Sequence, residues 1–243
     1  MKLRLIPKSS FNKNEEENLK KIVIFAECLL KKNNIPLPKQ IYFYNSLQKF
    51  IKKVLPEIKN YGFNKNISKE IIKCALNNGT YGTINFKEDS IIEMNFNPFN
   101  KGEYLPSEFL ELIVHESLHL HLSKKIKRDL NNLKFKFDKG SCIGNIEIIK
   151  FDEGYAQFMT EKILKDINQS KIKKLKISSK NNKKPYYQKK IKSIDIEKFD
   201  KIFEKVLVNN REKGFRLFKK RFNFKDNNKE ILFFALNGLE KII

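Results

Sequence analysis

The chain has 243 residues, of which 40% are hydrophobic, so it can bury the core of one large domain or of a domain with an appendage. Its three cysteines, Cys28, Cys74 and Cys142, are widely spaced and odd in number, which argues against a disulfide framework or a thiolate zinc site and fits a reducing compartment. The net charge of +22 comes mainly from lysine, in a chain also rich in asparagine and isoleucine. Because that composition is typical of an AT-rich genome, and nucleic-acid binding favours arginine, we expect solvated lysines rather than a nucleic-acid partner.

The N-terminal region has no apolar stretch long enough for a signal peptide or a membrane span. Its longest apolar run, Ile22–Ala26, continues after Glu27 only as far as Leu30. A bilayer requires about 20 apolar residues. We therefore expect a soluble, cytoplasmic protein without membrane contacts.

The first quarter of the chain predicts helices around one short strand. Glu15–Lys32 has a broad apolar face and acidic residues at its start, which indicates a helix. Gln40–Tyr44 is rich in β-branched and aromatic residues and predicts a strand. Two further helices are expected at Ser46–Leu55 and Ser68–Leu76, the second capped by its serine.

A hairpin and a buried helix follow. Thr80–Phe86 and Ile91–Asn97 are strand-like runs joined by the four residues 87–90. Pro106 opens a helix that runs to about Ser123 and is apolar nearly all round. A helix of that kind is buried, so its glutamates and histidines need partners.

The second half of the chain is basic and alternates between irregular and helical segments. Lys124–Lys150 is expected to be irregular, and Phe151–Ile167 to be helical. The lysine-rich segment Lys171–Lys192 predicts a loop or arm, and helices are expected near Ile194–Val208 and Asn228–Ile243. We therefore predict two parts, residues 1–170 and residues 171–243, the second being a basic segment with a helical subdomain.

Residues 115–119 of the buried helix read HESLH. Positions i and i+4 lie on one helix face, so His115 and His119 can bind one metal ion. Glu116 is rotated by about 100° from His115, where it can reach a metal-bound water without binding the metal. The pattern is typical of zinc hydrolases, in which the carboxylate is the general base. The alternative is a pair of core histidines, which is a strained interpretation for two of only three histidines in the chain.

A catalytic zinc ion needs a third protein ligand. His121 lies about 200° around the helix from His119, and no histidine follows it. Sites with three histidines, including the metzincin pattern, are therefore excluded. The third ligand should be a carboxylate or, as a weaker alternative, Cys142.

Residues 153–158 read EGYAQF, follow Asp152, and are expected to open the next helix. Gly154 and Ala156 are small enough to let that helix approach the HESLH helix closely. Here the sequence resembles the gluzincin group of zinc peptidases, the thermolysin-like and aminopeptidase-like catalytic domains, in which HExxH is followed by a helix carrying E-G-x-A-x-aromatic. The match covers about residues 80–165, in the order hairpin, HExxH helix, linker and glutamate helix.

The resemblance implies that His115, His119 and Glu153 bind one Zn²⁺ ion and that Glu116 is the general base. Taken alone, Glu153 would be an ordinary solvent-facing residue of a first helical turn, but the HESLH motif and the missing histidines favour ligation. The resemblance also implies that Ile91–Asn97 is a sheet edge that pairs with extended substrate.

That pairing makes Asn95, Phe96 and Asn97 the expected substrate contacts. Asp152 and Gln157, which stands one turn after Glu153, are candidates to orient the ligand imidazoles, with a helix cap and helix surface as their respective alternatives.

The chain departs from thermolysin-like members in two ways. Its gap between His119 and Glu153 is longer, and no histidine remains to stabilise the oxyanion. A tyrosine could take that role. The candidates are Tyr104, Tyr155, Tyr186 and Tyr187; we expect Tyr155 in the core and prefer Tyr187, because a mobile loop could bring it over the cleft.

Together these patterns predict an α+β, zincin-like fold in residues 1–170, with a small, mostly antiparallel sheet packed on the HESLH helix and a helical C-terminal subdomain. The predicted function is a zinc metallopeptidase acting on a peptide or protein substrate. One alternative is a nucleic-acid-associated basic protein that uses Lys171–Lys192. Another is a latent or inactive zincin whose cleft is blocked by its own C-terminal region.

Overall fold

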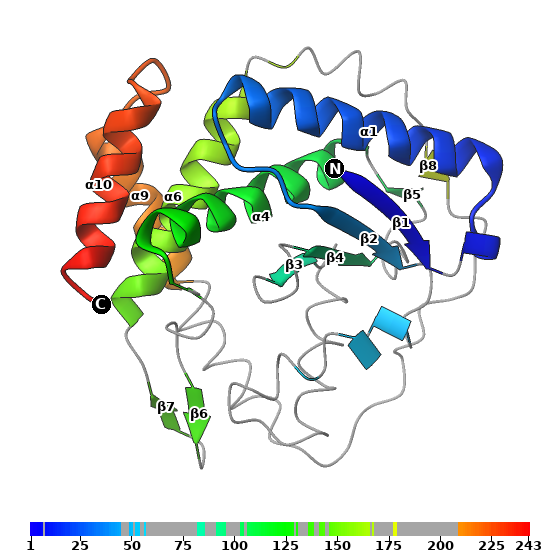
Figure 1. Ribbon diagram of the computed structural model, residues 1–243. Coiled ribbons are helices and arrows are strands. Elements are labelled where there is room, and N and C mark those ends of the chain that lie inside the picture. The colour runs from blue at the N-terminus through cyan, green and yellow to red at the C-terminus, as the bar shows by residue number, and fades with distance from the viewer. Residues whose placement is uncertain are drawn as a thin grey trace. The chain divides into compact units, whose positions relative to one another are not determined.

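Figure 1 shows the computed structural model of the chain, with its helices and strands labelled. The described residues are 1–6, 8–44, 49–50, 52–53, 56, 82–85, 91–95, 103–104, 106–128, 130, 136–138, 141–143, 146–165, 167, 177–178 and 209–243. Their contacts form two compact units. Unit 1 is Met1–Ser117 with Ile167–Lys192, and unit 2 is Leu118–Asp166 with Ser193–Ile243. This grouping follows contacts and not sequence order, and the predicted division at residue 170 stays a prediction.

Unit 1 contains a four-stranded sheet. Its strands are β1 (Lys2–Ile6), β2 (Gln40–Tyr44), β3 (Gly82–Asn85) and β4 (Ile91–Asn95), in the order β1-β2-β4-β3. β1 and β4 both pair with β2 in parallel, and β3 pairs with β4 antiparallel. The predicted hairpin is confirmed as β3–β4, and the α+β class is confirmed. The prediction of a mostly antiparallel sheet is wrong, because two of the three pairings are parallel.

The parallel pairing follows from helix α1 (Lys13–Lys32), which connects β1 to β2. A connection that includes a helix returns the chain in the same direction, whereas a short turn would reverse it. Asn12 and Glu15 form a capping box at the start of α1, with Asn12 Oδ1 accepting from the Glu15 amide at 2.9 Å. The helix ends at Asn33 and Asn34, and Asn34 takes a φ of 56°. The expected helix of Glu15–Lys32 is therefore confirmed.

β4 lies inside the sheet. It pairs with β2 on one side and with β3 on the other, and its residue Ile92 is fully buried. The expectation that Ile91–Asn97 is an exposed edge is therefore wrong. In the described part of the sheet, β3 and β1 are the end strands.

Helix α4 (Pro106–Ile126) contains the HESLH sequence. From Phe109 to Ser123 all of its residues are buried except Glu111 and Leu112, as the apolar pattern predicts. Within unit 1, Phe109 packs edge-on against Phe43 of β2, with ring centroids 5.2 Å apart. This contact anchors the first turn of α4 on the sheet. A short strand, β5 (Glu103–Tyr104), precedes α4 and pairs with β8 (Ile177–Ser178), so the basic segment 171–192 contains a strand.

Unit 2 is built around α6 (Ile146–Lys165), α9 (Asn209–Arg221) and α10 (Asn228–Glu240), with a small hairpin of β6 (Lys136–Asp138) and β7 (Ser141–Ile143). The hairpin lies in a segment expected to be irregular. α6 begins before the predicted Phe151, because Ile148 and Ile149 extend its buried face. Glu153 is therefore inside the helix and not at its start. α10 confirms the helix expected at Asn228–Ile243, whereas α9 was not expected.

Two glycines set the distance between α6 and α9. A Cβ added to Gly154 would lie 2.6 Å from the backbone of Gly214, and a Cβ on Gly214 would lie 2.0 Å from the Lys150 carbonyl oxygen. Backbone atoms therefore touch where these helices cross, and no side chain fits between them. The small residue after Glu153 lets α6 approach α9, which corrects the expectation that it serves the approach to the HESLH helix.

We expect Gly214→Ala to destabilise the protein by about 2–3 kcal/mol, because the new methyl group can be accommodated only by separating α6 from α9. Denaturant unfolding of the full chain measures this change. Gly238→Ala is a useful comparison, since its Cβ would meet the ring of Phe151 at 2.2 Å and a side chain can move more easily than a backbone. A Gly214→Ala protein as stable as the parent would contradict this description of the crossing.

Phenylalanine rings fill the space between α6, α9 and α10. Phe158 of α6 and Phe218 of α9 are almost completely buried, with ring centroids 6.1 Å apart, and Phe218 meets Phe234 of α10 edge-on at 5.3 Å. α9 and α10 thus supply much of the core against which α6 packs.

Among the helices of the part of the chain that the structure describes, none is both long and apolar enough to span a membrane.

Three further helices were expected on residues that lie outside the described ones: Ser68–Leu76, Ile194–Val208 and most of Ser46–Leu55.

Candidate metal centre

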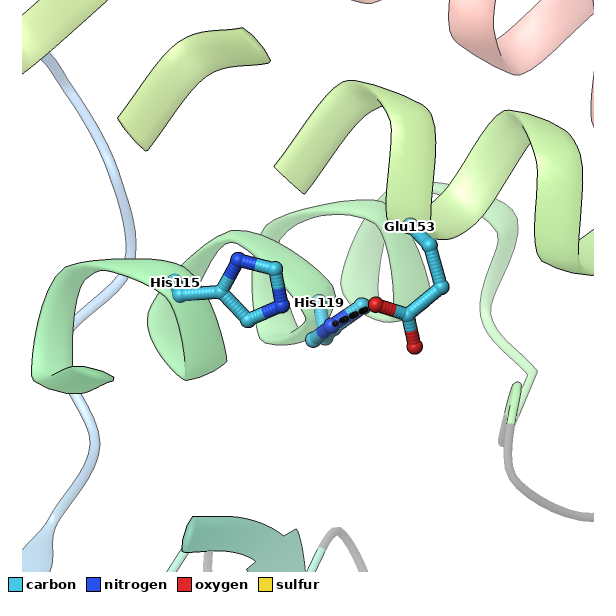
Figure 2. A group of neighbouring side chains, drawn as sticks. All are labelled: His115, His119 and Glu153. Atoms are coloured by element: carbon cyan, nitrogen blue, oxygen red, sulfur yellow. Dashed lines mark ion pairs between the residues drawn. The ribbon is translucent and has the colours of Figure 1, made fainter. Parts of the chain in front are cut away.

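His115, His119 and Glu153 come together in the structure, as Figure 2 shows. The two histidines lie one turn apart on α4, and Glu153 comes from α6. One potential ligand atom from each residue lies within 4.8 Å of the others. Both histidines are buried, and the Glu153 side chain is 17% exposed. The group therefore combines two enclosed imidazoles with a carboxylate that solvent can reach.

The spacing of the donor atoms fits a shared ion. His119 Nε2 lies 3.7 Å from Glu153 Oε2, which is longer than a hydrogen bond. Two ligands bound tetrahedrally to zinc, each at about 2.1 Å, lie about 3.4 Å apart. The observed separation of this pair is close to that value. The ligand atoms of all three residues lie within 4.8 Å of one another, so the side chains need to draw somewhat closer to share an ion. Two imidazole nitrogens and one carboxylate oxygen are also a donor set that zinc accepts.

Asp152 holds the His119 ring from the other side. Its Oδ1 lies 2.5 Å from His119 Nδ1, and its side chain is completely buried. An ionised carboxylate only accepts hydrogen bonds, so Nδ1 carries the proton and donates it. Nε2 is then the lone-pair nitrogen, and it is the nitrogen that faces Glu153. The structure thus places Asp152 where an orienting partner was predicted.

Replacing Asp152 by asparagine is expected to weaken zinc binding about 10-fold to 100-fold, because the neutral amide polarises the His119 ring less and orients it less firmly. Competition with a chromophoric chelator measures the affinity. Glu147→Gln is a matched control, since this exposed acid lies on the same helix and pairs with Lys150 at 3.0 Å. Equal affinities in both variants would show that Asp152 does not act on the ligand.

Gln157, the other candidate for that role, accepts a hydrogen bond from Arg211 of α9. Its contact with a ligand imidazole stays a prediction. Of the expected substrate contacts, Asn95 ends β4 opposite Tyr44, whereas Phe96 and Asn97 lie outside the described residues.

The remaining candidates lie in other elements or outside the described residues. Tyr186 and the preferred tyrosine, Tyr187, lie outside the described residues, and Tyr104 is in β5. The alternative ligand, Cys142, is in β7 opposite Phe137. Tyr155 packs in the core, as expected, and the residue is 1% exposed. Glu116 is buried beside His115 on α4.

His121 and Tyr155 form a contact that the sequence-based interpretation missed. His121 Nδ1 lies 3.1 Å from the Tyr155 hydroxyl. Burial lowers the pKa of His121 to about 4, with a smaller effect from the charge of Lys125, so the ring is neutral at neutral pH. Burial likewise raises the pKa of Tyr155. The sequence contained one indication of this contact. Tyr155 follows His121 by 34 positions, which is the spacing between His119 and Glu153 on the same two helices.

Comparison of the chain with protein-family models, with curated proteins and with solved structures found no match.

Proposed function

We propose that this protein is a zinc-dependent peptidase with one Zn²⁺ ion held by His115, His119 and Glu153. The observation that carries the proposal is the convergence of these three side chains from two helices, with Glu153 following His119 by 34 positions along the chain. Three protein ligands leave a fourth position for solvent or substrate, which distinguishes a catalytic zinc site from a structural one.

The proposed chemistry is hydrolysis by an activated water. A zinc ion held by these three residues would lower the pKa of a bound water to about 7 and would polarise the substrate carbonyl. Glu116 accepts the proton of the attacking water and transfers it to the departing amine. Its place on α4 supports this role, because it follows the ligand His115 directly and lies in the same buried stretch of helix. Asp152 accepts a hydrogen bond from His119 Nδ1–H, which directs the lone pair of Nε2 toward the proposed ion.

The fold supports a zincin-like organisation. A helix with HExxH packs on a small mixed sheet through Phe43 and Phe109, and a second helix carries the glutamate. The end strand β3 replaces β4 as the proposed peptide-binding edge, since β3 has one described partner strand and β4 has two. An extended peptide can add to such an edge through main-chain hydrogen bonds.

The two alternatives stay predictions. The arm that would bind nucleic acid lies outside the described residues except for β8. In a latent enzyme the C-terminal helices would block the cleft. In the structure, Phe218 of α9 packs against Phe158 of α6 and against Phe234 of α10, so these helices form a core with α6.

The proposal predicts a peptidase activity that depends on zinc. We expect the purified chain to cleave peptides from a mixed library, to lose at least about 90% of that activity when a chelator removes the metal, and to recover it when one equivalent of zinc is restored. Mass spectrometry identifies the products and elemental analysis the metal. Cleavage that persists in the metal-free chain would contradict the proposal, as would tight zinc binding without hydrolysis of any library peptide.

A further inference from the structure

α4 and α6 are joined by polar contacts at two places. The first is the contact of His119 with Asp152 and Glu153. The second is the contact of His121 with the Tyr155 hydroxyl, which is fully enclosed by the protein. The proposed zinc chemistry uses the first contact and leaves the second without a role.

The two contacts lie on different sides of α4. Residues two positions apart on an α-helix point about 200° away from each other, so His119 and His121 project from nearly opposite sides. Their partners Asp152 and Tyr155 are three positions apart on α6 and therefore lie on one face of it. One face of α6 thus contacts α4 on both flanks. Such a pair of contacts opposes rotation of α4 about its own axis, which a single contact would allow.

The Tyr155 ring also has an aromatic neighbour on α9. Phe218 packs edge-on against it, with ring centroids 6.3 Å apart, the same distance that separates the rings of Tyr155 and His121. Tyr155 therefore has little freedom to follow a movement of α4. In so enclosed an environment, a hydroxyl that lost its partner would also be costly.

We propose that His121 and Tyr155 are positioning residues for the metal centre: their contact fixes the rotation of α4 against α6 and so holds His119 at the distance from Glu153 that a shared ion requires. The inference rests on the metal binding in the proposed function and is independent of what the bound metal does. A rotation of α4 by a few degrees would move the His119 ring relative to Glu153, so the contact is expected to act on affinity for zinc.

The test is zinc affinity in Tyr155→Phe, measured by chelator competition on the full chain together with the thermal stability of the metal-free protein. Removal of this hydroxyl is expected to weaken zinc binding about 10-fold, at the lower end of the range for partners that contact a ligand directly. The matched control is Thr160→Val. Thr160 is also buried on α6, but its hydroxyl donates to the Ala156 carbonyl of the same helix at 2.7 Å.

Two variants of His121 separate the contact from the bulk of the ring. Asparagine can place a hydrogen-bonding atom near the position of Nδ1, and leucine cannot. We expect His121→Asn to keep zinc affinity within about threefold of the parent and His121→Leu to lose about 10-fold, as Tyr155→Phe does.

Unchanged zinc affinity in Tyr155→Phe would overturn the inference and leave the proposed function intact. An equal loss in Thr160→Val would also overturn it, because the effect would then be one of stability alone. A parent chain that binds no zinc would overturn both this inference and the proposed function.

Discussion

Glu116→Gln is expected to leave zinc bound and to lower the rate of peptide hydrolysis by about 100-fold to 10,000-fold, the usual contribution of a general base. Glutamine has the size and shape of glutamate but does not accept a proton at neutral pH. Because Glu116 is 9% exposed, a substitution of equal volume is also the one least disturbing to packing. The measurements are kcat/KM on a peptide substrate and zinc content by elemental analysis.

The matched control for this prediction is Glu111→Gln. Glu111 lies on α4 one turn before His115 and is exposed, so the same substitution on the same helix should change the rate less than about threefold. Turnover that is retained in Glu116→Gln would mean that another group transfers the proton. Loss of zinc from this variant would mean that Glu116 belongs to the metal ligands.

The second large effect concerns the ligand from α6. Glu153→Ala should reduce zinc affinity about 1,000-fold, because a tightly bound zinc ion gains roughly 10–16 kcal/mol in total, or several kcal/mol per ligand. Hydrolysis should fall with metal occupancy and should not be rescued by a tenfold excess of zinc. Isothermal titration calorimetry or chelator competition measures the affinity directly.

Glu161→Ala provides the comparison for that variant. Glu161 is on the same helix and pairs with Lys219 at 3.3 Å near the surface, an interaction worth at most about 1 kcal/mol. Its loss should leave zinc affinity unchanged. Tight zinc binding that survives Glu153→Ala would contradict the ligand set and would direct attention to Cys142.

Local patterns predicted both helices of the site, although α6 begins at Ile146 and not at the expected Phe151. The continuous apolar stretch around His115 and His119 predicted a buried helix, and α4 is buried from Phe109 onwards except for Glu111 and Leu112. The i, i+4 spacing placed both imidazoles on one face because helical geometry is fixed by the backbone alone. The approach of Glu153 could be expected from its resemblance to a known motif, and the structure brings it within reach.

Features that depend on contacts between distant segments could not be predicted in this way. The five residues of β1 show little that distinguishes a strand from an irregular N-terminus, and without β1 the parallel pairing through α1 could not be inferred. The contact of Gly154 with the backbone of Gly214 could not be predicted either. A glycine in a helix indicates that another segment approaches closely, but it does not identify that segment. The choice between Asp152 and Gln157 depended on where α6 begins and how it is rotated, which the tertiary packing decides.

Anomalous diffraction from a crystal of the zinc-loaded chain would locate the metal ion and identify its ligands. We expect one zinc peak within about 2.0–2.2 Å of a nitrogen of His115, Nε2 of His119 and a carboxylate oxygen of Glu153, with Asp152 still hydrogen-bonded to Nδ1 of His119. A zinc ion bound elsewhere, or one whose third protein ligand is a sulfur at about 2.3 Å, would contradict it.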